Sequence, residues 1–137
     1  MSNRPTGVTI LAILALIGGL ISLFLGGFET LLGPQVGEEM SKQTTDTSAA
    51  AYGSAITVIG IGLLFHGVLQ LITAFGLFAL KAWAWLLAVV MQVLSLVLNG
   101  MQLAADFNAG VMTGGIVALI ILYYLYRPHV KQAFGRA

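Results

Sequence analysis

Four long stretches without a charged residue constrain this chain more than any other feature. They cover residues 5–28, 47–80, 82–105 and 107–126 of the 137-residue sequence. About 20 apolar residues, each adding about 1.5 Å to a helix, span the ~30 Å hydrocarbon core of a bilayer. The sequence therefore predicts four membrane spans, at residues 8–28, 54–80, 83–102 and 111–126.

The four spans are expected to be helices. Apolar residues follow one another in them without the alternation that marks a spanning strand, and a helix satisfies its own backbone polar groups in lipid. The composition agrees, because only 8% of the residues are charged, whereas a soluble domain carries about a quarter. We therefore predict an all-α fold, a four-transmembrane-helix bundle that forms one membrane domain over residues 1–137.

Basic residues predict the orientation of the bundle. With four crossings, five of the six Lys and Arg residues fall on one side and only Lys42 on the other. The positive-inside rule makes the five-residue side cytoplasmic. Both termini are therefore predicted in the cytoplasm, and the protein in the cytoplasmic (inner) membrane. With two aromatic anchors, the predicted cytoplasmic interface comprises Arg4, Lys81, Trp83, Trp85, Arg127, Lys131 and Arg136.

The connections between the spans are unequal in length. Lys81 and its neighbours alone separate the second and third spans, which predicts a tight hairpin. Residues 29–53 are expected to form an external loop, either a solvated connector or a docking site for a partner. All five acidic residues fall on that outer side. Residues 127–137 are predicted to be a basic tail, with Val130 and Phe134 at the lipid interface and its cations near anionic headgroups.

Small residues recur every fourth position in the first and last spans. In lipid, small side chains let helix backbones approach closely, and such rows commonly mark helix contacts. They predict either packing inside the bundle or an outward face that grips a second copy or another protein. The predicted packing residues are Gly18, Ser22, Gly26, Gly110, Gly114 and Ala118.

Polar residues form a seam on the second and third spans. Their spacing by three and four places each set on one helical face. Because an unpaired amide is costly in hydrocarbon, we expect His66 and Gln70 to meet Gln92 and Ser95 across the tight hairpin. The seam is either a structural clasp or a water-lined path or ligand pocket. It comprises His66, Gln70, Thr73, Gln92, Ser95, Asn99 and Gln102.

His66 is the only histidine inside a predicted span. An ionisable residue at that depth is a functional candidate, and a metal or pigment bound to His66 is one alternative to a neutral, hydrogen-bonded side chain. No cofactor is predicted otherwise, and lipid is the expected ligand. The sequence has no nucleophile–base–acid set, no metal-ligand cluster and no phosphate-binding loop. It therefore predicts neither an enzyme nor a nucleic-acid-binding protein.

Three segments carry a resemblance to a family. They are the opening Arg4-Pro5-Thr6-Gly7-Val8-Thr9-Ile10-Leu11-Ala12-Ile13-Leu14, the linker Leu80-Lys81-Ala82-Trp83-Ala84-Trp85, and the close Tyr123-Tyr124-Leu125-Tyr126-Arg127-Pro128. Together they resemble the uncharacterised small four-helix membrane proteins of bacteria and archaea. That resemblance implies the fold but no activity and no catalytic residue.

Two functions are compatible with these features. The first is a structural or accessory subunit that associates with copies of itself or with a larger membrane complex. The second is a small transporter, channel, or ligand- or pigment-binding bundle that uses the polar seam.

Overall fold

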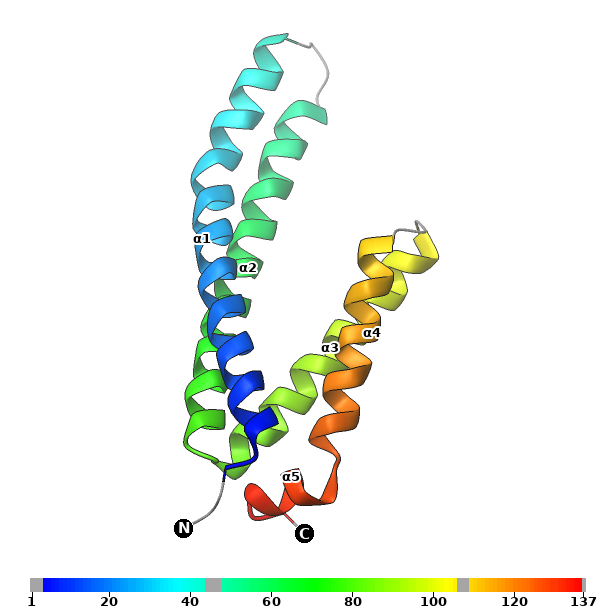
Figure 1. Ribbon diagram of the computed structural model, residues 1–137. Helices are drawn as coiled ribbons and strands as arrows, with labels where there is room; N and C mark the ends of the chain where they lie inside the picture. Colours follow the sequence, from blue (N-terminus) through cyan, green and yellow to red (C-terminus); the bar gives the residue numbers. More distant parts are fainter. Residues whose placement is uncertain (1–3, 44–47, 106–108, 137) are drawn as a thin grey trace. The chain divides into compact units, whose positions relative to one another are not determined.

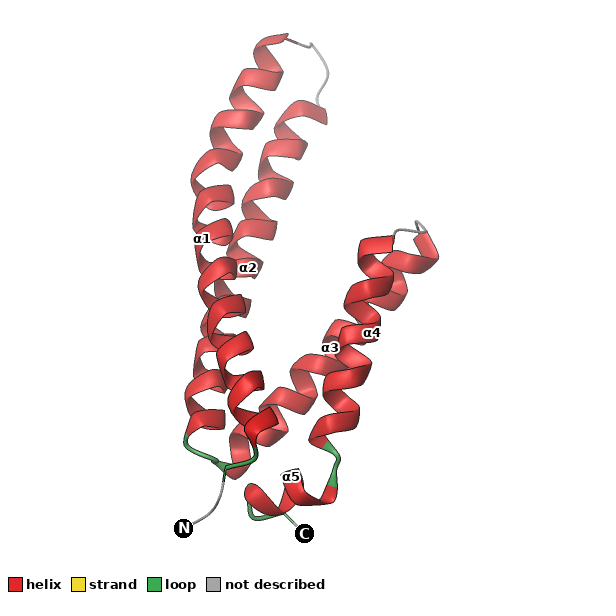
Figure 2. Ribbon diagram, viewed as in Figure 1, coloured by secondary structure: helices red, strands yellow, loops and turns green. Residues whose placement is uncertain are grey.

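The structure is a computed structural model that describes residues 4–43, 48–105 and 109–136. These residues form five helices: α1 (Thr6–Gln43), α2 (Ser48–Phe78), α3 (Ala82–Ala105), α4 (Ala109–Leu125) and the short α5 (Pro128–Ala133) (Figure 1). Figure 2 shows only helices and turns over the described ranges. The predicted all-α class is confirmed.

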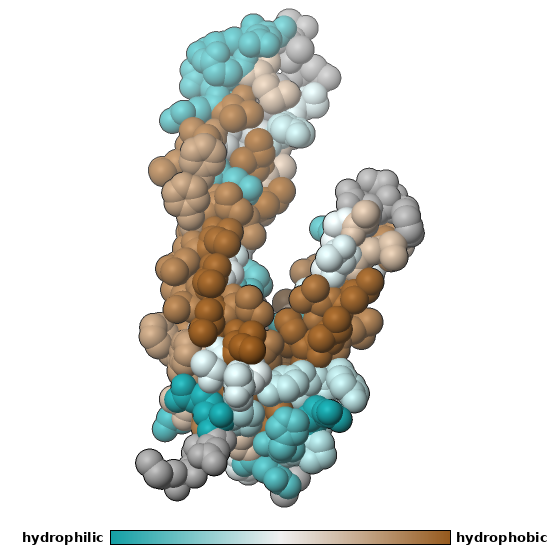
Figure 3. Space-filling view, in the orientation of Figure 1, coloured by the Kyte–Doolittle hydropathy of each residue, from teal (hydrophilic) through white to brown (hydrophobic). Residues whose placement is uncertain are grey.

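Three of the helices are long and apolar enough to cross a membrane. They are α1, α2 from Ala50 onward, and α3 up to Ala104. The fourth predicted span corresponds to α4, which is apolar but has 17 residues. A helix of that length is about 25 Å long, at the lower limit for a crossing. Figure 3 shows apolar residues over the middle of α1 and α2 and hydrophilic residues at their ends.

The chain divides into two compact units, which are described separately. The hairpin unit, Ala15–Ile72, contains most of α1 and α2. The terminal unit, Met1–Leu14 with Thr73–Ala137, contains the start of α1, the end of α2, and α3, α4 and α5.

The loop predicted at residues 29–53 is largely helical, while its external position stays a prediction. Helix α1 continues through Pro34 to Gln43, and α2 begins at Ser48. Residues 44–47, which include Asp46, lie outside the described residues. The extension is polar but still helical, with Lys42 3.0 Å from Glu38 one turn earlier, a spacing that favours a helix. Its 38 residues make α1 about 57 Å long, about twice the hydrocarbon thickness.

The connection between α2 and α3 is as short as predicted. Leu80 adopts a φ of 51°, and the Lys81 and Leu80 amides donate to the carbonyls of Gly76 and Leu77 at 2.9 and 3.1 Å. This pair of bonds is a Schellman motif, which usually places glycine at the left-handed position. The Leu80 side chain packs against the core of the terminal unit, which offsets the strain of that conformation.

The core of the terminal unit joins all five helices. Its buried side chains include Val8, Leu77, Trp85, Leu125 and Phe134. Val130 and Phe134 are therefore buried in protein rather than placed at the lipid interface as predicted. Pro128 begins α5 at a position where its missing N–H costs nothing, and the helix turns both side chains into the core.

Candidate functional site

A row of glycines forms the seam between α1 and α2 in the hairpin unit. Among the described residues of Ala15–Ile72, every buried residue is a glycine, so no large side chain is buried in this unit. We call this set the glycine seam. It comprises Gly19, Gly26, Gly33, Gly37, Gly53, Gly60 and Gly67.

The seam pairs its glycines in antiparallel order. Gly19 lies against Gly67, Gly26 against Gly60, and Gly33 against Gly53. At each member of a pair, the position that a β-carbon would occupy is 2.6–3.1 Å from the carbonyl oxygen of its partner. Five of these six distances are under 3.0 Å, closer than real β-carbons come, and the sixth is tighter than most, so glycine favours this backbone approach. A glycine hydrogen directed at a carbonyl also provides a weak C–H···O contact.

Two threonines donate hydrogen bonds to carbonyls of the seam. Thr30 donates to the Gly26 carbonyl at 2.6 Å, and Thr57 donates to the Gly53 carbonyl at 3.0 Å. Each threonine thus satisfies its hydroxyl hydrogen within its own helix, four residues back. The seam is built from backbone and small side chains.

The glycine seam has a sequence signal that four-residue spacing does not reveal. Six of its seven members recur every seven residues, at 19, 26 and 33 and again at 53, 60 and 67. A seven-residue period is the repeat that keeps one face of two supercoiled helices in contact. Of the predicted packing residues, Gly26 belongs to this row, whereas Gly18 and Ser22 flank it and are half-buried.

The predicted packing residues of α4 lie in different surroundings. Gly110 is exposed, and Ala118 is buried in the terminal unit. The methyl position of Gly114 is 3.0 Å from the amide oxygen of Asn99 on α3. Gly114 therefore allows a polar side chain of α3 to approach the backbone of α4.

The polar residues of α3 make contacts within the terminal unit. Asn99 donates to the carbonyl and the hydroxyl of Ser95 at 2.7 and 3.2 Å. Gln92 is half-buried and Gln102 is exposed. Thr73, at the end of α2, is buried.

His66 and Gln70 lie together in the hairpin unit. The Gln70 amide nitrogen is 3.5 Å from Nε2 of His66, and its amide oxygen is 2.6 Å from the methyl position of Gly18 on α1. The proposed contact of this pair with Gln92 and Ser95 involves both units and stays a prediction. Over the described ranges, no group of three His, Cys, Asp or Glu residues is arranged to hold a metal.

The predicted cytoplasmic interface residues gather in the terminal unit. Trp83 is 48% exposed, but Trp85 is only 5% exposed and donates its indole N–H to the Leu125 carbonyl at 2.9 Å. The position of Trp85 is therefore determined by protein contacts. Its ring also meets Tyr126 edge-on, with 5.4 Å between ring centroids.

The end of the α1–α2 hairpin has a shallow groove. It has a volume of about 500 Å³ and lies beside the proline of α1. Residues lining it include Pro34, Gly37, Ser41, Gly53 and Thr57. The groove lies where the sequence predicted a loop, on the polar extension of both helices.

Long apolar helices, exposed large side chains and a seam of glycine define a helical integral membrane protein. A family model described as "Predicted membrane protein (DUF2127)" matches residues 6–129. The chain belongs to this family of membrane proteins, whose function is unknown, and the predicted resemblance is confirmed. Neither the curated proteins nor the solved structures include a match to the chain.

Proposed function

We propose that this chain is a non-catalytic accessory module of the membrane, which associates through helix packing with copies of itself or with a larger membrane complex. The observation that carries the proposal is the closed glycine seam. It packs α1 against α2 through backbone contact and leaves no large side chain of the hairpin fully buried.

The outward face of α1 supports association through large side chains rather than through glycines. Five exposed apolar residues follow one another at intervals of four and three: Ile17, Ile21, Phe24, Phe28 and Leu31. This alternation is the spacing of a coiled-coil contact. The stripe lies half a helical turn from Gly19, Gly26 and Gly33, so a partner helix would not compete with α2.

The proposed topology has four crossings, with α4 as the last. Both termini lie in the cytoplasm, and the protein is in the inner membrane. The positive-inside bias supports it. So does the distribution of acids, since with four crossings all five acidic residues fall on the side opposite the five basic residues.

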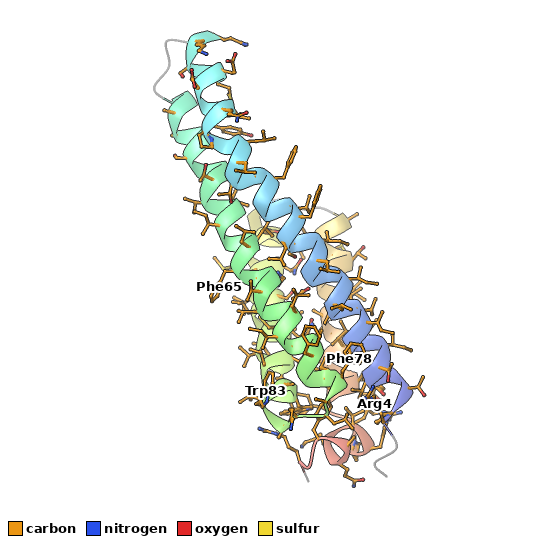
Figure 4. All side chains as sticks on the ribbon, turned by 90° about the vertical axis from the view of Figure 1, so that its left-hand side faces the viewer. Arg4, Phe65, Phe78 and Trp83 are labelled. Carbon is orange, nitrogen blue, oxygen red and sulfur yellow. The ribbon has the colours of Figure 1, made fainter. Side chains whose placement is uncertain are left out.

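Single cysteines test the association, because the native chain contains none. Phe24→Cys and Leu31→Cys, at positions 74% and 73% exposed, should give cross-linked copies or adducts with a partner in native membranes. Phe65→Cys on α2 is the matched control, since Phe65 is 68% exposed and points away from the ribbon (Figure 4). Absence of any adduct at both α1 positions would refute the proposal.

A small transporter or ligand-binding bundle is the second candidate. Two buried oxygens in the hairpin unit, on Gln70 and Glu29, accept no hydrogen bond among the described residues. Water or a ligand would satisfy them. Under this alternative, Gln70→Leu abolishes transport or binding in reconstituted vesicles, while the accessory role predicts unchanged complex formation.

A further inference from the structure

The charged side chains that the structure describes in the terminal unit are all basic. Its described residues include five Lys and Arg side chains and no Asp or Glu. We call this group the basic cap. It comprises Arg4, Lys81, Arg127, Lys131 and Arg136. In the view of Figure 3, hydrophilic residues cover the end of this unit that contains α5.

Four of the five cations lie over aromatic rings. Arg4 is 5.8 Å from the ring centroid of Phe78, and Figure 4 shows these two residues together at the start of α1. Arg127 and Lys131 lie 5.5 and 5.8 Å from the centroids of Tyr123 and Tyr126. Attraction to an aromatic ring holds a cation in place without neutralising its charge.

The fold positions these cations through backbone geometry. Gly135 adopts a φ of 67° and closes α5 with a Schellman motif, in which the Arg136 amide donates to the Lys131 carbonyl at 2.8 Å. The turn brings the Arg136 guanidinium to 4.9 Å from the ring of Trp85. Trp85 is itself fixed by its hydrogen bond to the Leu125 carbonyl.

The remaining basic residue of the chain differs from the cap. Lys42, in the hairpin unit, has carboxylates of Glu38 and Glu39 each at 3.0 Å, so its charge is already paired. The described contacts of the cap cations are with neutral groups: rings, the Phe78 carbonyl that accepts from Arg4, and the Tyr123 hydroxyl that accepts from Arg127 at 3.4 Å. A guanidinium has five N–H donors, so each keeps donors for a pair of phosphate oxygens.

An apolar face continues from the cap along α3. Trp83, Leu86 and Val90 are exposed at intervals of three and four, which places them on one side of the helix. A free phosphate has no apolar group to contact this face, whereas a phospholipid can pack an acyl chain against it. We propose that the basic cap binds the phosphate headgroup of an anionic phospholipid, with an acyl chain against this face of α3. This site does not depend on self-association.

The two tryptophans of the chain provide the test, because both lie at the cap. The full-length protein is reconstituted in phosphatidylcholine vesicles, and its fluorescence is quenched with either brominated phosphatidylglycerol or brominated phosphatidylcholine. The anionic lipid should quench more strongly at equal mole fraction. Arg136→Gln combined with Lys131→Gln should reduce this preference by roughly twofold to fivefold per cation, the strength of one basic residue near an anionic surface.

Two control variants separate the site from general effects. Lys42→Gln removes a cation outside the cap and should leave the preference unchanged. Arg136→Lys keeps the charge and should retain most of the preference, which excludes a simple loss of folding. Equal quenching by both lipids would overturn the proposal. So would loss of the preference when inorganic phosphate replaces chloride at constant ionic strength, since that would show a site for any phosphate.

Discussion

Gly26 of α1 lies directly against Gly60 of α2, and each backbone occupies the space that a side chain on the other would need. The β-carbon position of Gly26 is 2.6 Å from the Gly60 carbonyl oxygen, and that of Gly60 is 2.8 Å from the Gly26 carbonyl oxygen. Lipid chains are as apolar as leucine, so burial of large side chains adds little drive between helices in a membrane. The hairpin is therefore stabilised by close backbone contact.

Substitution at Gly26 tests this contact. Gly26→Ala places a methyl group 2.6 Å from the Gly60 carbonyl and 2.7 Å from the Leu64 amide nitrogen. Neither backbone atom can move without separating the helices, so we expect a loss of about 2 kcal/mol, within the usual range for overpacking. Thermal unfolding in detergent, followed by circular dichroism, measures the effect.

Gly27→Ala is the matched control. Its methyl position has nothing within 4 Å, and alanine favours a helix by up to about 1 kcal/mol over glycine. The control should be neutral or slightly stabilising. Equal stability of the two variants would contradict a seam built on backbone contact.

A second pair of adjacent glycines tests the contact between α3 and α4. Gly114→Leu must displace Asn99, whose amide oxygen is 3.0 Å from the methyl position, and Asn99 would then lose its bonds to Ser95. We expect a loss of roughly 1–3 kcal/mol. Gly115→Leu, with nothing within 4 Å, should leave the melting temperature unchanged. The reverse order of the two variants would refute the contact.

The buried hydrogen bond of Trp85 should stabilise the terminal unit. Trp85→Phe removes the donor and leaves the Leu125 carbonyl unsatisfied, which costs about 1–3 kcal/mol when the group is buried. Trp83→Phe, at an exposed position, should cost much less. Unfolding by denaturant compares the two variants, and similar costs would argue against the Trp85 bond.

Labelling of single cysteines tests the proposed topology. Ser41 and Gln132 are both exposed, and they belong to the polar extension of α1 and to α5. In intact cells, Ser41→Cys should react with a membrane-impermeant maleimide, while Gln132→Cys should react only after lysis. The opposite pattern would reverse the orientation. Reaction of both in intact cells would put the two termini on opposite sides, so the whole chain would cross the membrane an odd number of times.

Two carboxylates control the titration of Lys42. Hydrogen bonds to Glu38 and then Glu39 raise the pKa of the Lys42 ammonium above its ordinary value of 10.5. The folded state thus binds this proton more tightly, and the small stabilisation is complete below the ordinary pKa and lost as pH rises through the raised pKa. NMR titration of labelled lysine should show the Lys42 pKa returning to its ordinary value in Glu38→Gln with Glu39→Gln.

The uncharged stretches predicted the helices of this protein well. Residues 8–28, 54–80, 83–102 and 111–126 each fall almost entirely within one helix, because hydropathy alone decides which segments must satisfy their backbone internally. Hydropathy says nothing about where a helix ends in water. For that reason the extension of α1 to Gln43 and the burial of Val130 and Phe134 were both missed.

The sequence by itself determined the helical class, the spacing of the glycines and the separation of basic from acidic residues. Only the tertiary structure decided what those glycines contact. A seven-residue period of small residues identifies a contact face but not its partner, and pairing Gly19 with Gly67 requires α1 and α2 to lie antiparallel in one register. Likewise, charge counts predict Arg136 at a membrane interface, but its position over Trp85 depends on the left-handed turn at Gly135.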